Sequence, residues 1–315
     1  MSDLLQTTIN TLAVGGLYAL IALGYTLVYG ILRFINFAHS DIVAWGGWLA
    51  LTVASSFGWL VAGAAPVFAM PAVLLITMAI CALMGVSIEF LAYRPLRKAP
   101  RLNVLITAIG VSLFLQNVGL LDKFFGNRPK GISALLANDV LVTVAGVELR
   151  LFDAMTIVLA IVLVVVLERL VYGTKMGRAM RAVSFDERTA SLMGINVNVV
   201  VSLTFAIGSA LAAAGGLLFA FRNDLRQTAD ASWVLLGLKA FVAAVVGGIG
   251  NVRGAAAGAL LIAFVEVFVH RYISALFSGT QWVAQLQDVY VFAILILVLM
   301  FRPSGLLGKA TVEKV

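Results

Sequence analysis

The chain has 315 residues, of which 62% are hydrophobic and 12% charged, and its mean hydropathy is +1.05. Soluble domains contain about 45–50% apolar and about 25% charged residues, so this composition excludes an ordinary soluble domain and favours a protein embedded in the lipid bilayer. The net charge of +7 comes mainly from basic residues between hydrophobic runs, where the positive-inside bias places them, and does not indicate nucleic-acid binding.

Long apolar runs follow one another along the chain and predict membrane helices. In chain order they cover residues 12–32, 37–57, 66–93, 102–121, 152–172, 199–221, 233–246, 254–269 and 289–301. We expect Gly46-Gly47 to break the second run, and run 233–246 is short for a complete span. The predicted fold class is an all-α integral membrane protein, a polytopic bundle of about eight or nine hydrophobic segments, one or two of them short or broken. We expect these segments to form a single transmembrane domain over residues 1–315.

Basic residues cluster between particular runs and predict the orientation of the chain. Counting spans puts three groups on one side, which the positive-inside bias assigns to the cytoplasm, with the C-terminus there and the N-terminus outside. The groups are Arg94, Arg97, Lys98 and Arg101; Lys175, Arg178, Arg181 and Arg188; and Arg302, Lys309 and Lys314. A fourth group is expected outside, where it is diluted over a longer loop: Lys123, Arg128, Lys130 and Arg150. The first basic residue is Arg33, so no cleavable signal is expected and the first run stays in the mature protein.

The connection over residues 173–198 is predicted to lie in the cytoplasm and to contain a short helix of its own. Negative side chains suit its start, and Gly194 suits its end. The residues of interest are Asp186, Glu187, Arg188, Ala190, Leu192, Met193 and Gly194, of which Ala190, Leu192 and Met193 give an apolar surface. Two interpretations stay open: the helix docks into a groove of another protein, or it packs on its own bundle.

Polar residues inside the runs are candidates for a translocation path, because intramembrane polar groups are costly and often functional. The candidates are Tyr18, Tyr25, Asn36, His39 and Asp41. The alternative is that they pack and form hydrogen bonds within the chain. Glu266 and His270 stand four residues apart, on one helix face, either as a mutually satisfied pair or as a proton relay.

Glycine at Gly250, Gly254 and Gly258 has strict four-residue spacing, which lets another backbone approach one helix face. The approaching helix belongs either to the same chain or to a partner membrane protein. The single Cys81 lies within an apolar run and is expected to pack there. We find no phosphate-binding Gly-x-x-x-x-Gly-Lys-Ser/Thr sequence, no nucleophile–base set and no metal-ligand set, so we expect no enzyme activity, bound cofactor or metal.

Several segments together resemble a known family. They are residues 16–30 with 35–39, 89–97, 193–196, 247–254 and 301–306. Over about residues 10–308, the chain resembles the LivH-type permease subunit of the branched-chain amino acid ABC importer family. It departs from the family pattern at Ser40, where glycine is common, and at Arg188, where an acidic residue is common.

The resemblance implies a permease that passes branched-chain or other small neutral amino acids across the bacterial inner membrane. It implies a homologous LivM-type permease, two ABC ATPase subunits that use ATP, and a periplasmic substrate-binding protein as partners. The segment 173–198 would be the coupling helix that meets the ATPase. Alternatives are the same type of importer for urea, short amides or aromatic acids, a stand-alone ion-coupled secondary transporter using Glu266 and His270, or a scaffold without transport.

Overall fold

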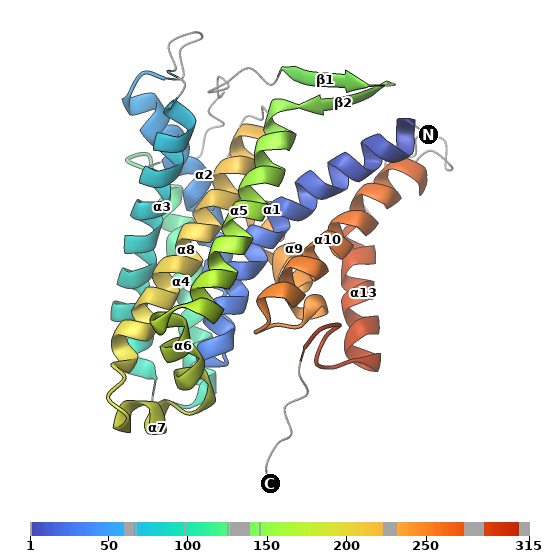
Figure 1. Cartoon of the computed structure of the whole chain (residues 1–315). Coiled ribbons are helices and arrows are strands. Elements are labelled where there is room, and N and C mark those ends of the chain that lie inside the picture. Colours follow the sequence, from blue (N-terminus) through green and yellow to red (C-terminus); the bar gives the residue numbers. More distant parts are fainter. Residues whose placement is uncertain are drawn as a thin grey trace.

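The structure is a computed structural model and describes residues 2–59, 66, 68–97, 99–124, 126, 139–144, 146–222, 232–273 and 287–308. These residues form a bundle of helices with one small strand hairpin (Figure 1). The α-helices are α1 (Ser2–Leu32), α2 (Ala38–Ser56), α3 (Ala69–Ile88), α4 (Arg101–Gly119), α5 (Leu151–Gly173), α6 (Lys175–Phe185), α7 (Glu187–Leu192), α8 (Val197–Arg222), α9 (Ser232–Gly247), α10 (Val252–Phe268) and α13 (Gln287–Phe301). Short π- or 3₁₀-helical turns follow α3 (η1, Glu89–Tyr93, and η2, Arg94–Leu96) and α10 (η3, Val269–Ile273).

Six helical segments among the described residues are long and apolar enough to cross a membrane. They are Ser2–Leu32, Ala69–Leu96, Leu102–Gly119, Leu151–Gly173, Val197–Phe221 and Val252–Tyr272. The protein is therefore a multi-pass membrane protein. Each expected run forms a helix, but the expected count of eight or nine is not confirmed for membrane spans. Helix α2 opens on a polar sequence, and α9 and α13 are shorter apolar helices.

Helix α1 lies at the centre of the bundle, which its length and buried surface explain. Its residues from Ala13 to Val28 are almost all buried, and it packs against α10, α8, α5 and α9. Apolar side chains on α3, α4 and α5 face outward instead, as expected where lipid surrounds a bundle. The helices therefore show no clear division into an apolar inner face and a polar outer face.

Helix α2 runs unbroken through Gly46-Gly47, so the expected break there was wrong. The glycine serves close packing instead, because a Cβ added to Gly46 would lie 2.5 Å from the Cα of Ala213 on α8. Small residues commonly let helix backbones approach in this way inside membranes. The interruption lies earlier, between α1 and α2, where Arg33 has a positive φ of 57°.

A hairpin of β1 (Val140–Val144) and β2 (Val147–Arg150), which the sequence analysis placed within a loop, pairs in antiparallel register. It lies at the end of the bundle where α1 begins (Figure 1). Gln6 joins the two: the Glu148 backbone N–H donates to its side-chain oxygen at 2.8 Å, and its side-chain nitrogen donates to the Glu148 carbonyl at 3.1 Å. The hairpin is thus fixed to the start of α1.

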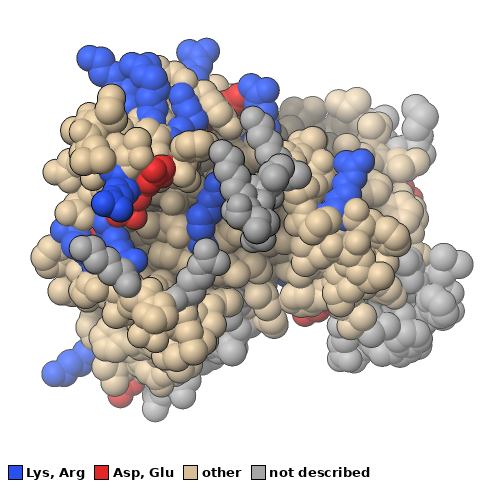
Figure 2. Space-filling model, turned by 90° about the horizontal axis from the view of Figure 1, so that it is seen from below, with Lys and Arg blue, Asp and Glu red and all other residues tan. Residues whose placement is uncertain are grey.

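The opposite end carries α6 and α7 (Figure 1), and Figure 2 shows Lys and Arg side chains gathered over this face. Arg97 donates to Asn198 at 2.8 Å, so the loop after α3 meets the start of α8 here. The described parts of the first two basic groups therefore lie at one end, and the placement of the third group on the same side stays a prediction. Lys98, Arg128, Lys130, Lys309 and Lys314 lie outside the described residues.

The stretch after α13 closes onto the corner between α9 and α10. The backbone N–H groups of Leu306 and Leu307 donate to the carbonyls of Val246 and Gly247, at 2.8 and 3.0 Å. The Asn251 side chain donates to the Leu307 carbonyl at 2.8 Å. The end of α9 and the stretch after α13 thus lie side by side, although they are far apart in sequence.

Candidate functional site

Helix α7 begins and ends where the sequence placed it. The Asp186 carboxylate accepts hydrogen bonds from the backbone N–H groups of Arg188 and Thr189, at 2.9 and 3.2 Å, and so caps the first turn. Gly194 adopts a φ of +82° just after the last turn, a conformation that glycine tolerates without a Cβ clash. Asn196 accepts from the Val199 N–H at 3.3 Å and caps the following helix, α8.

The side chains around α7 divide into a buried face and an exposed face. Ala190 is buried and packs in a small cluster with Met180, Val183 and Val200. The expectation that Ala190 belongs to the exposed apolar surface was therefore wrong, because it lies on the face that meets α6 and α8. Phe185, which the sequence analysis missed, is 94% exposed, and Leu192 and Met193 are each 80% exposed. We call these three side chains the apolar tip.

Charged residues surround the apolar tip. Asp186, Glu187 and Arg188 are all exposed. The pKa of Asp186 is held below its ordinary value, first by the hydrogen bond from the Thr189 hydroxyl and then by the backbone N–H groups that it caps. An anchored segment with an apolar tip and a charged rim has the chemistry of a docking element.

Removing the cap is expected to loosen α7 locally. We expect Asp186→Ala to speed hydrogen exchange several-fold at the amides of Arg188 and Thr189, while Asp186→Asn keeps most of the protection because its amide oxygen still accepts. Because the folded pKa is lowered, the cap is intact above the ordinary aspartate pKa of about 3.9 and is lost as the pH falls through the folded value. Exchange measured by mass spectrometry, with Glu187→Gln as the unaffected control, checks this; equal exchange in Asp186→Ala and the unmodified chain would contradict it.

Four of the five candidate path residues come together around the start of α2. The hydroxyls of Tyr25 and Ser40 lie 2.6 Å apart, and the His39 ring stands 4.4 Å from that of Tyr25. The other side chains have partners too: Tyr93 donates to Asn36 at 2.7 Å, and Gln116 donates to Asp41 at 2.9 Å. The four candidates are all buried within the chain, which favours the interpretation that they form hydrogen bonds within the bundle. Their assignment to a translocation path stays a prediction.

Tyr18, the fifth candidate, lies apart from them and donates to Glu266 on α10 at 2.6 Å. Glu266 also pairs with Lys239 of α9 at 2.9 Å, and Lys239 reaches Asp288 of α13 at 2.8 Å. Lys239 was not among the predicted residues, although a lysine within an apolar run is itself a signal of a buried partner. Between Glu266 and His270 the α-helix gives way to η3, so the assumed α-helical spacing does not hold.

A second ion network, centred on Glu89, lies at the α7 end. Its residues belong to segment 89–97, which was singled out only for its resemblance to the family. The Glu89 side chain has no exposed surface and pairs with Arg94 at 3.0 Å and with Arg97. The Ser202 hydroxyl of α8 donates to the same carboxylate at 2.7 Å. Glu89 therefore joins the turn after α3 to the first turns of α8, close to α7.

The glycine spacing has two separate causes. A Cβ on Gly254 would lie 2.6 Å from the Gly247 carbonyl oxygen, and one on Gly258 would lie 2.2 Å from that of Ala243. Those two positions serve the contact of α10 with α9, which is packing within the chain. Gly250 precedes α10 and has a φ of +94°, so it belongs to the turn and the expected three-residue helical stripe was wrong there.

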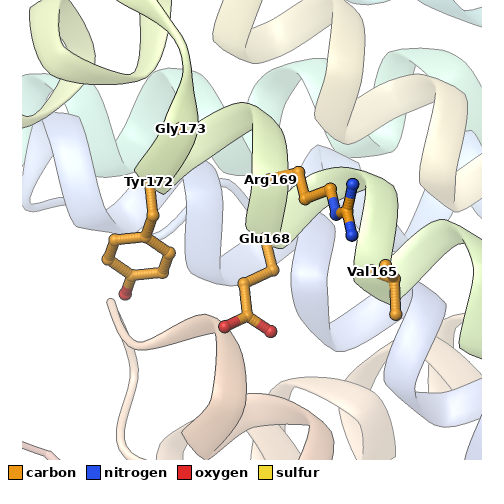
Figure 3. A pocket seen from close by; sticks show the side chains of 5 residues that line it. All are labelled: Val165, Glu168, Arg169, Tyr172 and Gly173. Atoms are coloured by element: carbon orange, nitrogen blue, oxygen red, sulfur yellow. The ribbon is translucent and has the colours of Figure 1, made fainter.

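A shallow depression of about 460 Å³ lies on α5 near its basic end, lined by Val165, Glu168, Arg169, Tyr172 and Gly173. Figure 3 shows Glu168 and Tyr172 directed to one side of the helix and Arg169 to another. Glu168 pairs with Arg253, which ties α5 to the first turn of α10.

Comparison with known families decides the class of this membrane bundle. A family model described as the branched-chain amino acid transport system permease component matches residues 7–299. The chain belongs to this family. Its members are transport components and not enzymes, and the resemblance stated from the sequence motifs is confirmed.

Curated relatives agree over nearly the full length. The chain is 38% identical over 314 residues to the high-affinity branched-chain amino acid transport system permease protein BraD of Pseudomonas aeruginosa, covering 99% of this chain and 98% of the relative. It is 36% identical over 322 residues to the corresponding protein LivH of Escherichia coli, covering 99% and 97%. The probable permease protein LivM of Methanocaldococcus jannaschii is a more distant match, 28% identical over 224 residues, covering 67% and 61%. These names favour the branched-chain amino acid interpretation over its alternatives.

Proposed function

We propose that this chain is the permease subunit of an ABC importer and passes branched-chain amino acids across the inner membrane with a homologous LivM-type permease. Family membership and the names of the full-length relatives support this role and substrate class. The proposed assembly also contains two ABC ATPase subunits, which use the ATP, and a periplasmic substrate-binding protein. This chain itself binds no cofactor in the proposal.

The observation that carries the proposal is the apolar tip. Phe185, Leu192 and Met193 project from a segment whose Ala190 is anchored in the bundle. An ATPase subunit with a matching groove would bury these side chains, and α7 would transmit its closure to α8 directly. The basic character of this end supports a cytoplasmic location for α7 and for the C-terminus.

Polar substitution of the tip tests the coupling role. In proteoliposomes containing all subunits, we expect Leu192→Ser with Met193→Ser to lower both leucine uptake and ligand-stimulated ATP hydrolysis at least ten-fold. The chain itself should keep its melting temperature, because both side chains are largely exposed. Leu307→Ser is the control, since Leu307 is a leucine with 51% exposure that lies outside α7.

A different experimental result would contradict each part of the proposal. Normal uptake and normal ATPase stimulation in the double variant would refute docking through α7. Failure of the complete wild-type assembly to import leucine, with import of another solute, would refute the substrate class. Proton-driven uptake by the isolated chain that is lost in Glu266→Gln would favour a secondary transporter instead.

A further inference from the structure

A pocket of about 450 Å³ opens at the basic end of the bundle; Phe185 of the apolar tip lies at its edge, whereas Leu192 and Met193 do not line it. It lies where the ends of α1 and α5 meet α6 and the corner between α9 and α10. Two arginines line it, Arg33 and Arg181, together with the hydroxyls of Thr26 and Ser184 and the amide of Asn251. None of its described lining residues is acidic. The pocket therefore offers hydrogen-bond donors and positive charge to a ligand, with no carboxylate to oppose an anion.

Arg33 occupies a backbone position that suits glycine. Its φ of 57° is the only positive value among the described non-glycine residues, and a Cβ is strained in this left-handed region. The position directly follows α1, where glycine commonly ends a helix. Within the described part of the chain, its guanidinium has no hydrogen-bond or ion-pair partner. Arg33 is exposed, so water solvates its charge in the free chain; the strained backbone position at a pocket indicates that the side chain serves a ligand.

Arg181 is held at the same pocket by two contacts. It donates to the backbone carbonyl of Val171, and its guanidinium lies 5.5 Å from the ring centroid of Tyr172. A guanidinium has five N–H donors, so donors remain for a ligand. Planar guanidinium groups match the oxygen geometry of a phosphate, and two of them at one pocket favour a phosphate over a neutral ligand.

The position of the pocket indicates where that phosphate comes from. The pocket lies at the ends of the membrane-spanning helices α1 and α5, and Leu27, Ile31 and Val171 give it an apolar wall. Tyr172, half-exposed at the end of a span, is typical of the membrane–water interface. We propose that this pocket binds the phosphate of an anionic phospholipid headgroup.

Lipid retention by the purified full-length chain tests the proposal. The chain is extracted from vesicles of phosphatidylglycerol and phosphatidylethanolamine, and bound lipid is counted by native mass spectrometry. A basic residue near an anionic membrane surface contributes about 1 kcal/mol, so Arg33→Gln is expected to lower phosphatidylglycerol retention about five-fold. The matched control is Arg178→Gln, because Arg178 is an exposed arginine of α6 that does not line the pocket. This variant should retain lipid as the unmodified chain does.

A second variant separates ligand binding from folding. Arg33→Gly should lose phosphatidylglycerol as Arg33→Gln does, but it should raise the melting temperature of the delipidated chain because glycine relieves the strain. Equal retention in all variants, or an equal loss in Arg178→Gln, would overturn the proposal. If inorganic phosphate binds to the chain and phosphatidylglycerol is retained no better than phosphatidylethanolamine, the pocket is a free-anion site and the lipid assignment is overturned. None of these measurements depends on transport, so they stand apart from the proposed import function.

Discussion

Replacing Glu89 by glutamine is expected to lower the free energy of unfolding by about 3–5 kcal/mol, the usual cost of removing one partner of a buried ion pair. The carboxylate is fully buried and pairs with both Arg94 and Arg97. Without it, two guanidinium groups remain close together with no opposing charge. A chemical or thermal melt of the chain in lipid nanodiscs measures the change.

An exposed ion pair provides the control for that experiment. Glu148 pairs with Arg150 at 3.4 Å, and about half of each side chain is exposed. Exposed pairs contribute about 0–1 kcal/mol, so Glu148→Gln should be nearly neutral. If Glu89→Gln proves as mild as Glu148→Gln, the buried network does not stabilise the join between the turn after α3 and α8.

Substitution of Gly258 by alanine is expected to destabilise the chain by about 1–3 kcal/mol through overpacking. The added Cβ would lie 2.2 Å from the Ala243 carbonyl oxygen and 2.6 Å from the Gly247 backbone nitrogen. Both are backbone atoms, which cannot rotate away as a flexible side chain can. The helices α9 and α10 must separate instead, which a lowered melting temperature would report.

Gly110 of α4 offers the opposite case for the same substitution. A Cβ there would meet nothing within 4 Å, so alanine adds helix propensity without a clash. Gly110→Ala should be neutral or stabilising by up to about 1 kcal/mol. A similar loss of stability in Gly258→Ala and Gly110→Ala would mean that backbone flexibility, and not close packing of α9 on α10, explains the glycine at position 258.

Much of the architecture was predictable because bilayer-spanning helices need long apolar runs. The ends of α7 were predictable for a different reason: Asp186 and Gly194 act through local backbone geometry, which depends on near neighbours in sequence. The sharing of one end by the basic loops followed from counting spans. The helices and the ends of α7 follow from neighbouring residues, whereas the shared end follows from the order of the runs along the chain.

The contacts between distant segments were not predictable in the same way. In a lipid-exposed bundle, apolar residues cover both inner and outer faces, so periodicity does not show which face is buried. The exposure of Phe185 and the burial of Ala190 depend on where α6 and α8 lie. The partners of Lys239 are residues 27 and 49 positions away, on helices whose packing no local pattern specifies. The Gly46-Gly47 pair showed the same ambiguity, since glycine suits both a broken helix and a close helix contact.

The pairing of Leu306 and Leu307 with the corner between α9 and α10 bears on how the protein is made. The ribosome synthesises Val246 and Gly247 well before the residues that bond to their carbonyls, and α13 lies between the two segments in sequence. The corner therefore cannot reach its final state until the residues after α13 have been synthesised. It can close only after α13 has been made, which makes this junction a late event in the folding of the chain.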